Sequence, residues 1–103
     1  MTILELAEQL VARRDANRAE WNTSQAAREL GKDRGTVHDY LTIGSRLTQE
    51  VRNLLRGTRW ASSTTVLLAL ARVTPPRRQL EEAHRLLHAN PKNAKDAVAL
   101  ISQ

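Results

Sequence analysis

Residues 23–47 read TSQAARELGKDRGTVHDYLTIGSRL, and this stretch decides the fold. In its first part, Ala26, Ala27 and the closing leucine recur at helical spacing, which predicts a short amphipathic helix over residues 24–30. Gly31 follows directly. Glycine often ends a helix because it adopts a positive φ without a steric penalty, so we expect a tight turn at this point.

A second helix is expected after this turn. The Asp33 carboxylate is placed to accept hydrogen bonds from the free N–H groups of the first helical turn. Val37 and Leu41, together with Tyr40, supply the buried side of the helix. The helix is predicted to end at a turn over residues 43–47, which contains a glycine.

The two helices are expected to cross closely. Ala27 lets the backbones approach, Gly31 makes the turn, and Val37 fills the angle between the helices, at separations of four and six residues. This order is typical of a helix-turn-helix, here over residues 22–47, whose second helix enters the major groove of DNA. The alternative is an ordinary helical hairpin with a solvated outer face.

Polar side chains on the outer side of this unit supply the candidate DNA contacts. Arg34 suits a bidentate contact to guanine. Asp39 suits a contact to a cytosine amino group, orientation of Arg34, or pairing with another nearby arginine. The start of the first helix suits a phosphate, as do Lys32, Arg46 and Arg59. The candidate DNA-binding residues are Thr23, Ser24, Gln25, Lys32, Asp33, Arg34, Gly35, Thr36, His38, Asp39, Thr42, Arg46 and Arg59.

The charge distribution favours a nucleic-acid partner. The 103 residues carry 16 Lys and Arg against 11 Asp and Glu, which gives a net charge of +5. Residues 1–30 hold four basic and five acidic groups, whereas residues 31–103 hold twelve and six, so the positive charge begins at the predicted turn. A positive field of this kind attracts a polyanion.

The chain is expected to form one all-α domain of six or seven short helices around the helix-turn-helix. Its aromatic residues are Trp21, Tyr40 and Trp60, so aliphatic side chains must build most of the core. We expect Trp21 to pack under the helix-turn-helix as a core anchor. No alternation typical of strands is present. The domain divides into residues 1–21 (N-terminal helix and connection), 22–47 (helix-turn-helix) and 48–103 (supporting helices).

Capping residues and helix breakers predict the remaining helices. Thr2 and Glu5 form a capping box that opens the first helix. Asn22 or Thr23 caps the next one, with Gln25 placed to reach back. Further helices are predicted from Thr48 to Gly57, from Val66 to Val73, from Arg77 to Ala89 after two prolines, and from Asn93 to Ile101.

Other kinds of site have little support in the sequence. The absence of cysteine excludes disulfides and thiolate zinc sites. Glu81, His84 and His88 share a helix face that suits zinc, but an exposed face produces the same spacing, so neither a metal nor another cofactor is expected. Neither a catalytic triad nor a phosphate loop is present, and an enzyme is not expected. No membrane span or signal peptide is visible, which predicts a cytoplasmic protein. The predicted DNA binding would place it at the nucleoid or on a plasmid.

Three segments resemble a known family in order and spacing. They are TSQAARELGKDRGTVHDYLTIG, then LTQEVRNLLRGTRWASSTTVLLALA, then QLEEAHRLL followed by NAKDAVALI. From Trp21 onward the chain resembles the central DNA-binding domain of the ParB family, which includes plasmid repressors of the KorB kind. The family's nucleotide-binding module and C-terminal dimerisation domain have no counterpart here, so CTP binding is not expected.

The resemblance implies sequence-specific binding of double-stranded DNA, in plasmid or chromosome partition or in operator repression. Since one helix-turn-helix reads about half a turn of groove, we expect a homodimer on an inverted repeat. A partition ATPase is a further expected partner. The alternative function, from another class, is a helical protein-interaction module whose basic face docks an acidic partner.

Overall fold

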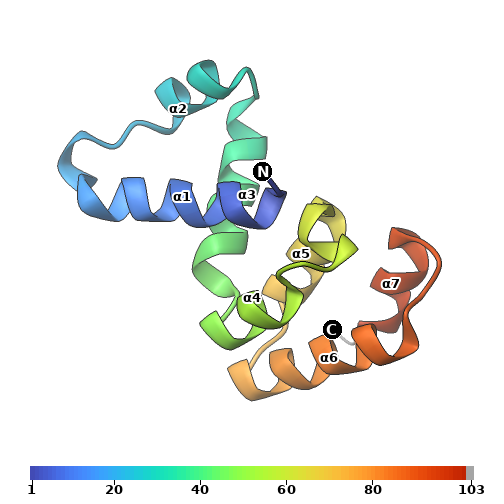
Figure 1. Ribbon diagram of the computed structural model, residues 1–103. Helices are drawn as coiled ribbons and strands as arrows, with labels where there is room; N and C mark the ends of the chain where they lie inside the picture. The colour runs from blue at the N-terminus through green and yellow to red at the C-terminus, as the bar shows by residue number, and fades with distance from the viewer. Residues whose placement is uncertain (102–103) are drawn as a thin grey trace.

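The computed structural model describes residues 1–101, which form seven α-helices and two short 3-10 helices without any strand (Figure 1). The α-helices are α1 (Ile3–Ala16), α2 (Thr23–Leu30), α3 (Arg34–Arg46), α4 (Gln49–Leu55), α5 (Thr64–Ala71), α6 (Pro76–Ala89) and α7 (Ala94–Leu100), and the 3-10 helices are η1 (Arg18–Glu20) and η2 (Arg59–Ser62). The prediction of an all-α fold is confirmed. Within the described residues, no helix has both the length and the apolar character needed to cross a membrane.

Most of the α-helices are preceded by a capping residue. Its side chain accepts a hydrogen bond from the backbone N–H of the residue three positions later in the chain. Both hydrogen bonds of the predicted Thr2–Glu5 capping box are present: the Thr2 side chain accepts from the Glu5 N–H, and the Glu5 side chain accepts from the Thr2 N–H. These bonds satisfy N–H groups that the helix itself leaves free. α6 begins instead with Pro76, whose fixed φ suits a first helical position. The capping residues are Thr2, Asn22, Asp33, Thr48, Ser63 and Asn93.

The prediction of a turn over residues 43–47 is wrong, because α3 continues to Arg46. Gly44 is buried within this helix, where α1 lies across α3 (Figure 1). A Cβ atom at Gly44 would lie 2.6 Å from Val11 Cγ2 and 2.7 Å from the carbonyl oxygen of Ala7. The glycine therefore permits the close crossing of two helices and does not end one.

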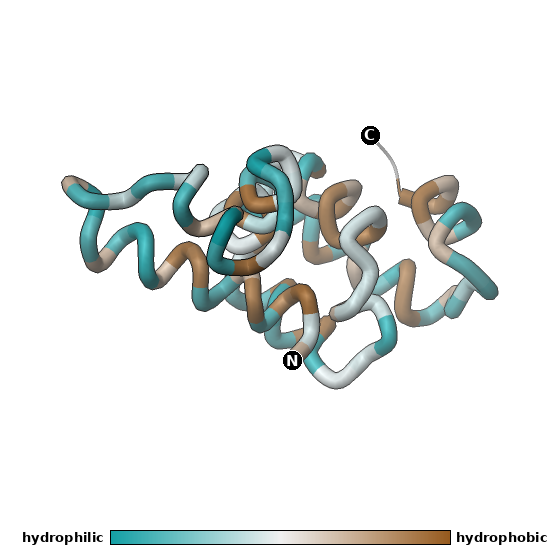
Figure 2. The backbone as a smooth tube through the Cα atoms, turned by 90° about the horizontal axis from the view of Figure 1, so that it is seen from above, coloured by the Kyte–Doolittle hydropathy of each residue, from teal (hydrophilic) through white to brown (hydrophobic). Residues whose placement is uncertain are grey.

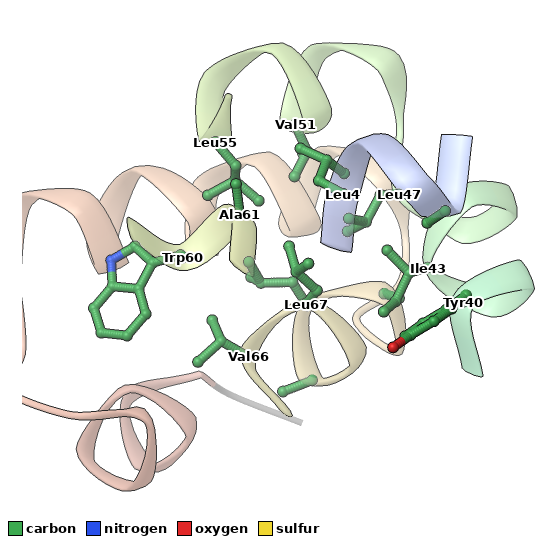
Figure 3. Close-up of a cluster of buried hydrophobic side chains, with 14 of the residues drawn as sticks. Leu4, Tyr40, Ile43, Leu47, Val51, Leu55, Trp60, Ala61, Val66 and Leu67 are labelled. Atoms are coloured by element: carbon green, nitrogen blue, oxygen red, sulfur yellow. The ribbon is translucent and has the colours of Figure 1, made fainter. Parts of the chain in front are cut away.

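Aliphatic side chains from several helices build the core. Figure 3 shows Leu4 of α1, Ile43 of α3, Val51 of α4 and Leu67 of α5 in one buried cluster. Viewed from above, hydrophobic and hydrophilic stretches alternate along the helices, whereas the connection between α1 and α2 is mostly hydrophilic (Figure 2). The core thus holds α3 through Ile43 in its C-terminal half and through Val37 nearer its start.

The tryptophan in the core is Trp60, and the prediction that Trp21 is a core anchor needs correction. Trp60, in η2, is 4% exposed, whereas Trp21 is half-buried and packs at the edge of the core. The indole N–H of Trp21 donates to Thr23 Oγ1 at 3.0 Å, and Arg13 lies over its ring at 5.7 Å. Trp21 therefore links the end of α1 to the start of α2.

Candidate nucleic-acid interface

α2 and α3 are joined by a short turn over residues 31–33 and contact each other. Gly31 has a φ of +67°, and the next backbone N–H, that of Lys32, donates to the carbonyl of Ala27 at 2.9 Å. Asp33 Oδ1 then accepts the Thr36 N–H at 2.7 Å, and this hydrogen bond holds the pKa of Asp33 below its usual value. These bonds set the angle between the two helices through the turn itself.

The two halves of α3 have different surroundings. In the N-terminal half, Arg34, Gly35 and His38 are exposed. In the C-terminal half, Tyr40 and Ile43 are buried beneath α1 and α5. The first turns of α3 therefore present exposed polar residues beside α2, and Ser45 and Arg46 are exposed again at the other end of the helix.

A hollow of about 350 Å³ lies between the starts of α2 and α3. Thr23, Arg34, Gly35 and His38 line it, so the fold brings together four residues predicted from two separate helices. Within residues 1–101, no carboxylate lies within 4.0 Å of the Arg34 guanidinium. The suggested pairing of Arg34 with Asp39 is thus not formed in this structure, and the guanidinium is free to contact a ligand.

A second, larger groove continues from this hollow. It has a volume of about 480 Å³ and shares His38 with the hollow. Four of its lining residues were predicted as DNA contacts, namely His38, Asp39, Thr42 and Arg46. Arg14, Ser45 and Arg72 also line the groove. Sequence reasoning missed these three, because nothing in their local pattern indicates that α1, α3 and α5 meet there.

The remaining predicted residues near α2 and the turn have mixed roles. Ser24 is half-buried in the first turn of α2, and Lys32 is exposed in the turn. Asn22 Oδ1 accepts the backbone N–H of Gln25 at 3.0 Å, as predicted. The Gln25 side chain, however, donates along the helix to Glu29 and does not reach back to the cap. Gln25 is therefore exposed but directed along α2.

The structure does not bring Arg59 to the other candidates. Its guanidinium donates to the carbonyl oxygens of Lys92, at 3.1 Å, and Pro91, and it lies 4.2 Å from the centre of the Trp60 ring. These contacts hold Arg59 against the connection between α6 and α7, at the opposite end of the molecule from α2 (Figure 1). Arg59 thus has a structural role there.

A buried glutamine positions the end of α3. Gln79 of α6 is 2% exposed. Its Nε2 donates to the carbonyl of Arg46 at 3.0 Å, and its Oε1 accepts the Thr48 N–H at 2.9 Å. Both polar groups of the amide are therefore satisfied, and the junction between α3 and α4 is held against α6.

Some of the arginine side chains form ion pairs within the part of the protein that the structure describes, whereas others do not. Arg52 of α4 and Arg56, directly after α4, both bind Glu8 of α1. The structure also pairs Arg13 with Glu29, Arg14 and Arg18 with Asp15, Arg77 with Glu81 and Arg85 with Glu82. Among the described residues, Arg34, Arg46 and Arg72 have no carboxylate within 4.0 Å, and the same holds for Arg28, Arg59, Arg78 and the three lysines. Of these, Arg34, Arg46 and Arg72 lie along the hollow and the groove.

The possible zinc ligands do not form a cluster. Glu81 lies 3.9 Å from Arg77 in an ion pair. Across residues 1–101, no three His, Asp or Glu side chains are placed to hold a metal ion, and this includes His84 and His88.

Comparison with family models, with curated proteins and with solved structures found no match to this chain. The chemistry of the hollow and the groove is therefore the basis for a functional inference.

Proposed function

We propose that the protein binds double-stranded DNA sequence-specifically through α2 and α3. The observation that carries this proposal is the exposed start of α3, where Arg34, which forms no ion pair with another described residue, lies beside the start of α2 in an open hollow. Such an arrangement suits insertion into a major groove, in which the first residues of the second helix contact base edges. The net charge of +5 supports a polyanionic partner.

Each residue of the hollow has a chemical role in this proposal. Arg34 donates two hydrogen bonds to O6 and N7 of a guanine, the commonest specific contact in DNA recognition. His38, one helical turn later, reaches a neighbouring base or phosphate, and Asp39 accepts from a cytosine amino group. Thr23, at the start of α2, lies where N–H groups and the helix dipole favour a phosphate.

The proposed biological role follows the resemblance to ParB-type domains. It is partition of a plasmid or chromosome, or repression from an operator of the same kind. One helix-turn-helix contacts only about half a helical turn, so two copies on an inverted repeat are the expected assembly. A partition ATPase remains a proposed partner in the first of these roles.

The test is selection of bound sequences from a pool of random duplexes at one fixed salt concentration, with the wild type and Arg34→Ala in parallel. The salt is fixed because non-specific affinity changes by orders of magnitude with it. We expect the wild type to enrich an inverted repeat. In the variant, the preference for one particular base pair in each half-site should weaken by about 1–3 kcal/mol, which is roughly 5- to 150-fold in relative affinity.

Arg77→Ala is the matched control, because Arg77 is exposed on α6 and lies outside the hollow and the groove. It should enrich the same repeat as the wild type. If no motif emerges and the wild type and Arg34→Ala bind all duplexes equally weakly, the proposal is wrong. A search for an acidic protein partner would then follow.

A further inference from the structure

The second groove contains a cluster of arginines that the helix-turn-helix alone does not explain. Arg14 comes from the last turn of α1, Arg46 from the last turn of α3, and Arg72 from the end of α5. We infer that these three side chains form a phosphate clamp, which grips one strand of the DNA backbone beside the bases that α3 contacts. This inference rests on the proposed function.

The position of each arginine has a simple local explanation, but their convergence does not. A cation in the last turn of a helix is favoured by the helix dipole. That effect acts within one helix and does not require three helix ends to meet. Here Arg14 and Arg72 are far apart in the chain and line the same groove of about 480 Å³.

The charges in the groove favour an anion. Arg46 and Arg72 have no carboxylate within 4.0 Å in the described chain, and Asp39 is the one acidic residue among those that line the groove. Arg14 is partly engaged, because its Nε pairs with Asp15 at 3.2 Å. Three arginines against one aspartate leave the lining positive, which matches the chemistry of a phosphodiester.

A hydrogen bond already holds one arm of the clamp in place. Arg14 Nη2 donates to Ser45 Oγ at 3.2 Å, which ties the end of α1 to α3. Gln79 holds the other side, because it binds the backbone of Arg46 from α6. The guanidinium groups are therefore presented by packed helices, and less conformational entropy is lost on binding than for arginines on a mobile loop.

The length of α3 places the clamp beside a DNA strand. Its 13 residues span about 20 Å at 1.5 Å per residue, whereas the major groove is about 12 Å wide. A helix that inserts its N-terminal turns at a steep angle to the groove therefore has its C-terminus outside the groove, beside the phosphate backbone. Arg46 lies at that end, and His38 joins the groove to the base-reading hollow.

The experiment measures the salt dependence of binding to one duplex of arbitrary sequence. The proteins are the wild type, Arg46→Gln, Arg72→Gln, the double variant, and Lys95→Gln, which removes one charge from an exposed position on α7. The slope of log K against log salt is negative, and each lost phosphate contact should decrease its magnitude by about 0.9. We therefore expect a decrease of about 2 in the double variant and no change in Lys95→Gln.

Two further results separate this inference from the proposed function. In the selection experiment, the double variant should enrich the same motif as the wild type, because phosphate contacts carry no base information. A reduced slope without any enriched motif would support the clamp and contradict base reading by Arg34. An unchanged slope in the double variant, or an equal decrease in Lys95→Gln, would overturn the clamp, provided that thermal melting shows the variants folded.

Discussion

Gly44 shows how one missing side chain fixes the position of the proposed reading helix. A Cβ atom there would lie 2.6 Å from Val11 Cγ2 and 2.7 Å from the backbone oxygen of Ala7, both on α1. Real Cβ atoms do not approach backbone this closely, so α1 and α3 must separate in any variant with a larger residue.

We therefore expect Gly44→Ala to lower the free energy of unfolding by about 1–3 kcal/mol, the range typical of an overpacked core. Urea unfolding followed by circular dichroism measures this. Gly35→Ala is the matched control on the same helix, since its nearest contact would be Asp33 Oδ1 at an ordinary 3.6 Å. It should stabilise the exposed helix start by about 0.5–1 kcal/mol. Equal stability of Gly44→Ala and the wild type would contradict the crossing.

At the scale of elements, a single buried amide joins α6 to the junction between α3 and α4. Gln79 donates to the Arg46 carbonyl and accepts the Thr48 N–H. Because Gln79 is almost fully buried, removing its amide leaves two partly buried backbone groups without their protein partner. The orientation of the end of α3, with its arginine, thus depends on a helix that lies outside the helix-turn-helix.

We predict that Gln79→Leu, which keeps the approximate size of the side chain, lowers stability by about 1–3 kcal/mol for each backbone group left without a partner. Chemical denaturation measures the loss. Gln49→Leu, at an exposed position in the same junction, should be within about 0.5 kcal/mol of the wild type. The prediction fails if the two variants unfold at the same denaturant concentration.

At the scale of the whole molecule, Glu8 links the N-terminal helix to α4. Its carboxylate accepts from Arg56 Nη1 and Nη2, both at 2.8 Å, and from Arg52 Nη1 at 3.2 Å. The hydrogen bonds from Arg56, followed by the charges of both arginines, hold the pKa of Glu8 below its usual 4.5. The folded state therefore stabilises the ionised form of Glu8 more than the unfolded state does.

The sign of the pH dependence follows from this shift. A lowered folded-state pKa contributes stability that is present above about pH 4.5 and is lost as the pH falls through the folded-state value. Glu8→Gln should thus be less stable than the wild type at pH 7, by up to about 1 kcal/mol for a partly exposed pair. The difference should disappear in acid.

Thermal melting of both proteins from neutral to acidic pH tests this prediction. Glu50→Gln is the control, because Glu50 is exposed on α4 and forms no ion pair with another described residue. Its difference from the wild type should be small at every pH. A Glu8→Gln deficit that stays constant down to strongly acidic pH would show that the loss is steric and not electrostatic.

The sequence by itself determined the helix boundaries that depend on local chemistry. Asp33 caps α3 by accepting the N–H of Thr36, three residues away, and Gly31 takes the left-handed conformation directly after α2. Both interactions lie within a few residues of chain, so their residue types appear at fixed offsets in the printed sequence. The spacing of the aliphatic residues likewise determined the all-α class, since these residues recur at helical periodicity.

Only the tertiary structure decided what the same residue types do at a distance. A glycine within helical periodicity can end a helix or admit a crossing partner, and only the position of α1 shows that Gly44 does the second. Arginines give no local sign of partners that lie far away in the chain. Arg59 binds the connection before α7, whereas Arg14 and Arg72 converge beside α3. Packing of helices far apart in sequence sets these contacts, and a pattern confined to neighbouring residues carries no information about it.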